Sequence, residues 1–284
     1  MSEGAAQGTR EPEPEPKPDR LPSEFEEAAR NRLMSDERAR RLRRFWRMLP
    51  SSPRCKLCTS PFGAPLGPLL RLVGKGPWPG NPRYCGGCFK DLYTHRGGAE
   101  VECSFFFADI RGSTGLAETM RANEFRALLD RFYTTAADVL VAHEAVVDKF
   151  VGDEVVGIFV PAMAGTNHAQ RAIDAGVALL RATGNDGEAP WVPIGIGVNT
   201  GSAFVGTVGT AEHVEFTALG DAVNVTARLA SAAWAGELLV TDAAARAAQL
   251  PAQDLERRQL DLRGKTTTTE VLVIMAGTPR RRDP

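Results

Sequence analysis

Two aspartates are the first residues in this chain whose type and spacing could support chemistry. Phe105 to Phe107 form a short apolar run, which predicts a buried β-strand that ends at Asp109. Asp153 lies at the turn between two β-branched runs in residues 146–156, the pattern of a β-hairpin. Carboxylate oxygens are the ligands that Mg²⁺ and Mn²⁺ prefer. The two acids therefore predict a site for one or two such ions.

The segment directly after Asp109 has the residues of a phosphate site. Arg111 is followed by Gly112, Ser113 and Thr114, which can open a helix. The first N–H groups of a helix lack partners within it and attract phosphate. We therefore expect Gly112, Ser113 and Thr114 to bind a nucleoside triphosphate beside the metal ions.

Four of the five cysteines form two Cys-x-x-Cys pairs, Cys55 with Cys58 and Cys85 with Cys88. Each pair can form a tight knuckle, and two knuckles can surround a tetrahedral zinc ion. The segment between the pairs has too many Gly and Pro residues for a core of its own, so we predict a structural zinc module over residues 50–96. An iron–sulfur cluster or a redox-active thiol set is an alternative, because four cysteines also suit these.

Composition and charge narrow the class of protein. A length of 284 residues with 43% hydrophobic residues is typical of one large or two modest folded domains. A net charge of −1 gives no general reason to expect nucleic acid or an anionic membrane as partner. No apolar run approaches the ~20 residues of a membrane span, and no export signal opens the chain, so we expect a cytoplasmic protein. Basic residues in the cysteine module could bind nucleic acid, an alternative that we do not favour. They are Lys56, Arg71, Lys75, Arg83 and Lys90.

The N-terminal segments are of different kinds. Residues 1–22 contain a Pro/Glu tract and are predicted to be disordered. Residues 23–49 predict a linker helix, with Ser23 as cap and Glu26 as its capping-box partner. Its arginine-rich second half also fits an amphipathic helix on a membrane surface. We favour packing of its apolar stripe against a neighbouring domain or a second protomer. Residues 279–284 are predicted to be a basic tail.

Residues 97–278 alternate between strand and helix patterns. This order predicts an α+β sandwich with an antiparallel or mixed sheet and helices on one face. After the first strand the predicted elements are a helix over 125–140, the hairpin, a helix over 166–182, strands at 192–198 and 203–207, a helix from about 221, and closing strands at 238–240 and 271–274.

Residues 101–275 resemble the catalytic domain of class III nucleotide cyclases, the adenylate and guanylate cyclases. The motifs FADIRGST, KFVGD, VNTG and TALGDAVNVTARL occur in the order typical of that family. The resemblance implies a ferredoxin-like core with added elements, which works as a head-to-tail homodimer with active sites at the interface. The implied reaction converts a nucleoside triphosphate to a 3′,5′-cyclic monophosphate and pyrophosphate by two-metal-ion catalysis.

The resemblance also implies roles for the polar residues in these motifs. Asp109, Asp153 and the backbone carbonyl of Ile110 would bind the two Mg²⁺ or Mn²⁺ ions. Arg228 matches the arginine that stabilises the charge developing on the α-phosphate. Asn224, on the same face of one helix, matches the asparagine that orients the ribose. The metal ligands of one protomer would face the remaining groups of the other.

Three further residues bear on the substrate. Lys265 resembles a lysine that reaches the terminal phosphates. Lys149 matches the purine-selecting lysine of the family, and Thr217 falls where many members carry aspartate. An ammonium group only donates hydrogen bonds, so Lys149 suits adenine N1, an acceptor, and Thr217 can accept from the adenine 6-amino group. ATP is therefore the expected substrate, with a guanylate cyclase and a catalytically silent signalling module as alternatives.

Overall fold

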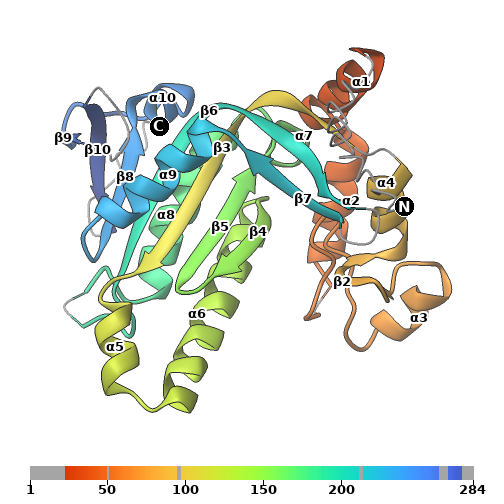
Figure 1. Cartoon of the computed structure of the whole chain (residues 1–284), viewed down its shortest axis with the longest axis horizontal. Coiled ribbons are helices and arrows are strands. Elements are labelled where there is room, and N and C mark those ends of the chain that lie inside the picture. Colours follow the sequence, from red (N-terminus) through yellow and green to blue (C-terminus); the bar gives the residue numbers. More distant parts are fainter. Residues whose placement is uncertain are drawn as a thin grey trace, which may run out of the picture.

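A computed structural model gives the fold (Figure 1). The predicted tails and Lys265 lie outside the residues that it describes. Over those residues, no helix is both long enough and apolar enough to cross a membrane. The described residues are 23–49, 51–94, 97–187, 189–210, 214–261 and 268–276.

An eight-stranded mixed sheet forms the centre of the molecule, in the order β4-β5-β3-β6-β8-β10-β9, with β7 paired to β6 beside this path. Strands β6 and β8 are parallel, and the other pairs are antiparallel. The predicted α+β class is confirmed. The strands are β3 (Gly98–Ile110), β4 (Val146–Val151), β5 (Glu154–Phe159), β6 (Ile194–Gly209), β7 (Val214–Leu219), β8 (Glu237–Thr241), β9 (Glu256–Leu260) and β10 (Thr269–Met275).

Strand β6 corrects one sequence prediction, because the two strands expected at 192–198 and 203–207 form a single one. Strand β3 pairs with β6 along its whole length, from Gly98 opposite Gly206 to Ile110 opposite Ile194. The small polar residues at 199–202 resemble a turn in the sequence. Pairing with a long neighbour keeps them extended instead, since it gives their backbone groups partners.

Helices cover both faces of the sheet, so the prediction of helices on one face was wrong. Helices α6 (Ala122–Ala142) and α8 (His168–Ala182) share one core with Phe106, which points to their face. Helix α9 (Asp221–Ala232) packs on the opposite face, where Phe107 contacts Ala230 (Figure 1). Alternation along β3 explains this, because successive side chains of a strand point to opposite faces and both sets here are apolar.

Two glycines of β6 allow α9 to lie directly on the sheet. A Cβ atom added at Gly197 would lie 2.6 Å from the Thr226 carbonyl oxygen, and one added at Gly195 would lie 2.8 Å from the Ala233 carbonyl oxygen. Both distances are below van der Waals contact, so only glycine permits this approach. The position of α9, which carries Asn224 and Arg228, therefore depends on these glycines.

The N-terminal segment consists of two helices where the sequence predicts one, α1 (Ser23–Met34) and α2 (Glu37–Arg47). Asp36 begins the second, because its side chain accepts a hydrogen bond from the Ala39 N–H at 2.8 Å. The predicted cap Ser23 has a side chain outside the described set. Apolar residues Ala29 and Leu33 of α1 pack against the core beside β3.

Arginines of α2 bind the end of α6. Arg47 donates to the Val141 carbonyl at 2.8 Å, and Arg43 donates to the Ala145 carbonyl at 2.8 Å. Glu144, which is buried, lies 3.3 Å from Arg47. Cations at a helix C-terminus satisfy its free carbonyls and its dipole. These contacts give the basic residues of α2 a packing role against the end of α6.

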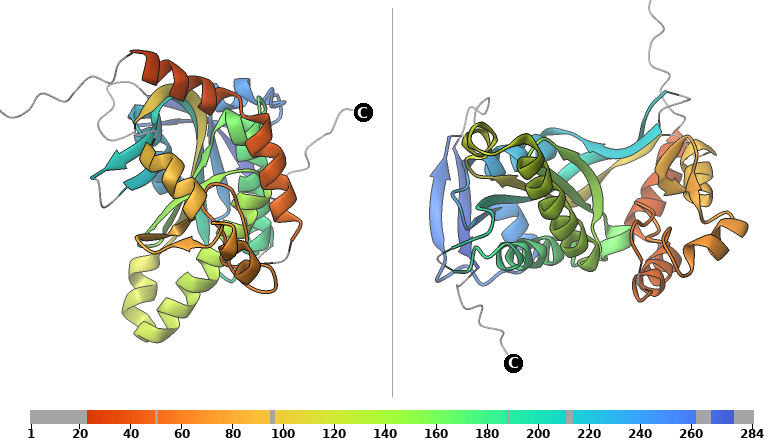
Figure 2. Two further views of the ribbon diagram at one scale, coloured as in Figure 1. Left: turned by 90° about the vertical axis from the view of Figure 1, so that its right-hand side faces the viewer. Right: turned by 90° about the horizontal axis from the view of Figure 1, so that it is seen from below.

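The cysteine module follows α2 and lies at the opposite end of the molecule from β9 and β10 (Figure 2). Its position beside β7 brings it close to Thr217, one of the predicted site residues. Its elements are α3 (Gly67–Leu72), β1 (Pro77–Trp78), β2 (Asn81–Cys85) and α4 (Gly86–Thr94). The remaining helices of the chain are α5 (Ser113–Thr119), α7 (Pro161–Ala164) and α10 (Asp242–Ala247).

Candidate active site

The two predicted metal-binding acids lie side by side. Asp109 is the last residue but one of β3 and pairs with Glu154 of β5, so Asp153 comes directly before its partner residue. The backbone N–H of Ile110 donates to the Asp153 carbonyl at 3.3 Å, while the Ile110 side chain is buried in the main core. The end of β3 and the turn of the β4–β5 hairpin are thereby held together.

A hydrogen bond joins the two carboxyl groups and shifts their pKa values in opposite directions. Burial and a hydrogen bond to Asp153 raise the pKa of Asp109 to about 6. Burial also acts to raise the pKa of Asp153, but hydrogen bonds from Ser113 and Asp109 outweigh it and hold that pKa below its ordinary value. Burial and the two neighbouring acids raise the pKa of Glu154 to about 7. Clustered acids of this kind, with hard oxygen donors, fit a divalent cation that would replace the proton.

These shifts predict a pH dependence for the stability of the metal-free protein. The folded state holds the protons of Asp109 and Glu154 more tightly than the unfolded chain does, with pKa values of about 6 and 7. Their contribution is therefore present below about pH 4 and is lost as the pH rises through these values. The free energy of unfolding, measured with urea in EDTA, should fall between pH 5 and pH 8. Asp109→Asn should make this fall shallower, and an unchanged slope in that variant would contradict the assignment.

Arg111 also binds Asp109, which sequence reasoning missed. Its guanidinium pairs with the Asp109 carboxylate and donates to the Ser231 carbonyl at 2.9 Å. It thus joins the end of β3 to the C-terminal end of α9. The one signal in the sequence was a basic residue two positions after the acid, which is common on any surface.

The predicted phosphate-binding residues lie at the start of α5. Gly112 has a φ of 71°, a left-handed conformation that favours glycine, and it directs the chain from β3 into the helix. Ser113 lies against Asp153, whose carboxylate it hydrogen-bonds. Thr114 is exposed to solvent. Of the three, Ser113 contacts the acid pair.

The two predicted base-selecting residues also lie together. Lys149 of β4 donates from Nζ to the Thr217 hydroxyl of β7 at 3.2 Å. The Thr217 hydroxyl in turn donates to Asp148 Oδ2 at 2.8 Å. Lys149 Nζ lies 3.2 Å from the same Asp148 oxygen. Asp148 was not singled out in the sequence, and it fixes the geometry of this pair.

Asn224 and Arg228 lie on the α9 surface. Asn224 is exposed and Arg228 is half-buried, and neither side chain has a hydrogen-bond or ion-pair partner within the part of the chain that the structure describes. Lys149 lies in β4, and Asp153 follows at the turn of the same hairpin. Among the described residues, no hydrogen bond or ion pair joins the acid pair, the Lys149–Thr217 pair and these two α9 residues.

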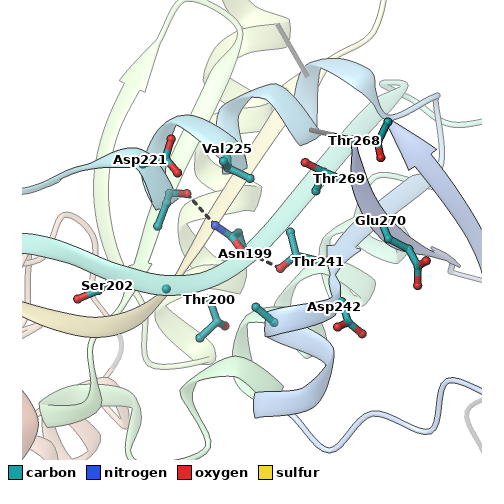
Figure 3. Close-up of a pocket in the computed structure, with 13 residues that line it drawn as sticks. Asn199, Thr200, Ser202, Asp221, Val225, Thr241, Asp242, Thr268, Thr269 and Glu270 are labelled. Carbon is teal, nitrogen blue, oxygen red and sulfur yellow. Dashed lines mark hydrogen bonds between the residues drawn. The ribbon is translucent and has the colours of Figure 1, made fainter. Parts of the chain in front are cut away.

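A cavity of about 520 Å³ lies beside the start of α9 (Figure 3). Its floor is held by Asn199, which donates to the Ala222 carbonyl at 3.0 Å and accepts from the Thr241 hydroxyl at 2.8 Å. Residues of the VNTG and TALGD motifs line it, but neither of the two predicted metal-binding acids does. These motif residues therefore lie against the start of α9 and not beside the acid pair.

The four module cysteines converge on one point. Their Sγ atoms all lie within 4.8 Å of one another, and Cys58 and Cys85 Sγ are 3.7 Å apart. Thiolates around a tetrahedral zinc at ~2.3 Å would be about 3.8 Å apart, so the donor set fits this ion. The Cys85 N–H donates to Cys55 Sγ at 3.3 Å and the Cys88 N–H to Cys85 Sγ at 3.4 Å, which orients the thiolates inward.

Comparison with known proteins decides the family. The model of the adenylate and guanylate cyclase catalytic domain matches residues 98–275, well over half of the chain. The chain belongs to this family. Adenylate cyclase 1 of Rhizobium meliloti is 33% identical over 134 residues, which are 45% of this chain and 20% of that protein. The chain spans about a quarter or less of the curated relatives that it matches.

Solved cyclase structures have the same fold. The guanylyl cyclase Cya2 has a TM-score of 0.57 at 25% identity, over 62% of this chain and 93% of that one. The adenylyl cyclase CyaB from P. aeruginosa has a TM-score of 0.56 at 27% identity, over 65% and 97%. These two relatives are named for different nucleotides, so the substrate of this cyclase must be argued from its own residues.

Proposed function

We propose that this cyclase converts ATP to 3′,5′-cyclic AMP and pyrophosphate, as an intracellular signalling enzyme. The observation that carries the preference for ATP is the direction of the Thr217 hydroxyl. Its proton is donated to Asp148 Oδ2 at 2.8 Å, and a carboxylate in an ion pair cannot donate one back. Lys149 Nζ donates to one lone pair of the Thr217 oxygen at 3.2 Å, and the second lone pair is available as an acceptor.

An acceptor at Thr217 and a donor at Lys149 match the edge of adenine. The adenine 6-amino group donates and its N1 accepts, whereas guanine offers an acceptor at O6 and a donor at N1. Guanine would place its O6 against the Thr217 lone pair and its N1–H against the ammonium of Lys149. The arrangement thus supports ATP even though threonine, taken alone, could donate or accept.

The acid pair supports the chemistry. Asp109 and Asp153, with the Ile110 carbonyl, would hold two Mg²⁺ or Mn²⁺ ions. Such ions, when bound, acidify the ribose 3′-hydroxyl and neutralise the phosphates. Ser113 orients Asp153, and Arg228 would stabilise the charge on the α-phosphate with Asn224 beside the ribose.

A head-to-tail homodimer would complete the site. Within one protomer and among the described residues, no hydrogen bond or ion pair joins the acid pair, the Lys149–Thr217 pair and the α9 residues, and Asn224 and Arg228 lack such partners. A second copy facing the first would place its Lys149, Thr217, Asn224 and Arg228 opposite Asp109 and Asp153. A silent signalling module would be favoured by loss of one of these six residues, and all are present.

We also propose a structural zinc ion for the cysteine module, on the geometry of its four thiolates. Binding of nucleic acid by the module is not favoured. Two of its basic residues are engaged with acids of the cyclase domain, Lys56 with Asp148 at 3.1 Å and Arg83 with Glu215 at 3.4 Å.

Assays of the full chain with ATP and GTP and Mn²⁺ test the proposal. We expect cyclic AMP as the main product, and Lys149→Met should lower kcat/KM for ATP about ten- to a hundredfold, the value of a hydrogen bond to a charged group. Lys90→Met, on the surface of α4, is the matched control and should change nothing. Preference of the wild-type protein for GTP would contradict the substrate, and absence of product from both nucleotides would contradict the activity.

A further inference from the structure

A buried chain of contacts joins the cysteine module to the residues that face the base. Lys56 lies between Cys55 and Cys58 in the first knuckle, and its side chain is 6% exposed. Its Nζ lies 3.1 Å from Asp148 Oδ1 and donates to the Phe216 carbonyl at 2.9 Å. The residues that follow in each strand are Lys149 and Thr217, the base-selecting pair.

Asp148 divides its two oxygens between the module and this pair. Its side chain is 4% exposed, and Oδ1 faces Lys56. Oδ2 accepts from the Thr217 hydroxyl at 2.8 Å and lies 3.2 Å from Lys149 Nζ. The carboxylate is thereby held by contacts at both oxygens, with Oδ2 accepting the proton of the Thr217 hydroxyl.

The module also holds β7 through a second side chain. The Lys56 backbone N–H donates to the Arg83 carbonyl at 2.8 Å, so the lysine is anchored in the module. The Tyr84 hydroxyl, on the same strand as Arg83, donates to Glu215 at 3.0 Å and accepts from the Phe216 N–H at 3.1 Å. The module therefore binds β7 at Glu215 and Phe216, directly before Thr217.

We propose that Lys56 is a positioning residue for purine recognition, through which the cysteine module sets the base specificity of the cyclase. This inference rests on the proposed function and deepens it. Lys56 balances the charge of Asp148 on Oδ1, so Lys149, 3.2 Å from Oδ2, shares this buried carboxylate with a second cation. Without Lys56, Lys149 would be the remaining cation, and Asp148 would compete more strongly with the base for its ammonium group.

Substitution of Lys56 by methionine tests the proposal, because methionine keeps the length and apolar stem without the charge. We expect KM for ATP to rise about tenfold, with kcat within about twofold, and the ratio of kcat/KM for ATP over GTP to fall about tenfold. A merely structural role would lower kcat and folded fraction for both nucleotides alike. Lys56→Arg, which restores a cation, should recover part of the ratio.

Arg83→Met is the matched control. It lies in the same module and contacts Glu215 at 3.4 Å, but its side chain is 57% exposed and does not touch Asp148. Both KM and the nucleotide ratio should stay at the wild-type values. Lys56→Met protein with a wild-type ratio and KM would overturn the proposal.

A second variant keeps the proposal testable if Lys56→Met fails to fold. Asp148→Asn lies in β4, outside the module, and should lower the ATP over GTP ratio while the metal content stays unchanged. An unchanged ratio in this variant would also overturn the proposal. If the wild-type protein makes no cyclic nucleotide, the proposed function fails. Binding of a fluorescent ATP analogue then decides the present inference, since equal Kd values for wild type and Asp148→Asn would refute it.

Discussion

Asp109→Asn is expected to lower cyclic AMP formation at least about a thousandfold in the presence of Mn²⁺, while leaving the protein folded. Asparagine keeps the shape of the side chain but removes the charge and one of the oxygens that a divalent ion needs, and metal-assisted charge stabilisation is worth several kcal/mol. Steady-state assays at saturating ATP measure the loss.

Stability separates loss of the metal site from damage to the fold. Burial and Asp153 raise the pKa of Asp109 to about 6, so at pH 7.5 the metal-free protein must bury the charged carboxylate, and a neutral side chain avoids this cost. Metal-free Asp109→Asn should therefore melt at or above the wild-type temperature at pH 7.5. Asp130→Asn is the matched control, since Asp130 is an exposed acid of α6 that pairs with Arg126 at 3.0 Å. Activity of Asp109→Asn within tenfold of wild type would remove Asp109 from the metal site.

The acid pair and the long helices could be predicted from the sequence because local patterns determine them. A buried strand that ends at Asp109 and a hairpin with Asp153 at its turn need only pairing of β3 with β5 to bring the acids together. The 3.6-residue spacing in 125–140 likewise places α6 correctly, apart from its ends. Lys149 and Thr217 come from distant strands, and only the resemblance to the cyclases paired them.

Other features depend on tertiary neighbours that a single sequence does not reveal. Strand β6 stays extended through 199–202 because β3 runs beside it, and α9 covers the second face because Gly195 and Gly197 make room for it. Asp148 and Lys56 look like ordinary surface charges in the sequence. Only the docking of the module against β4 and β7 buries them and makes them part of the site.

Removal of metal from the cysteine module is expected to lower the melting temperature by about 10 °C. The module has a small core, with Phe62 as the buried apolar side chain beside Cys55 and Cys85. Four thiolates without a cation would repel one another there, and structural zinc contributes folding free energy directly. A loss of about 4 kcal/mol corresponds to this shift for a chain of such size. Calorimetry before and after a strong chelator measures it.

The effect should extend beyond the module. Arg43 of α2 donates to the Leu57 carbonyl inside the first knuckle and to Ala145 at the end of α6, so loosening of the knuckle frees the contact between α2 and the cyclase domain. Elemental analysis should find one zinc per chain, and Cys88→Ser should lose it. Cys103→Ala, a buried cysteine of β3 outside the cluster, should keep it. Iron with visible absorption in place of zinc would assign a cluster to these thiolates, and an unchanged melting temperature after chelation would show that the module folds without any ion.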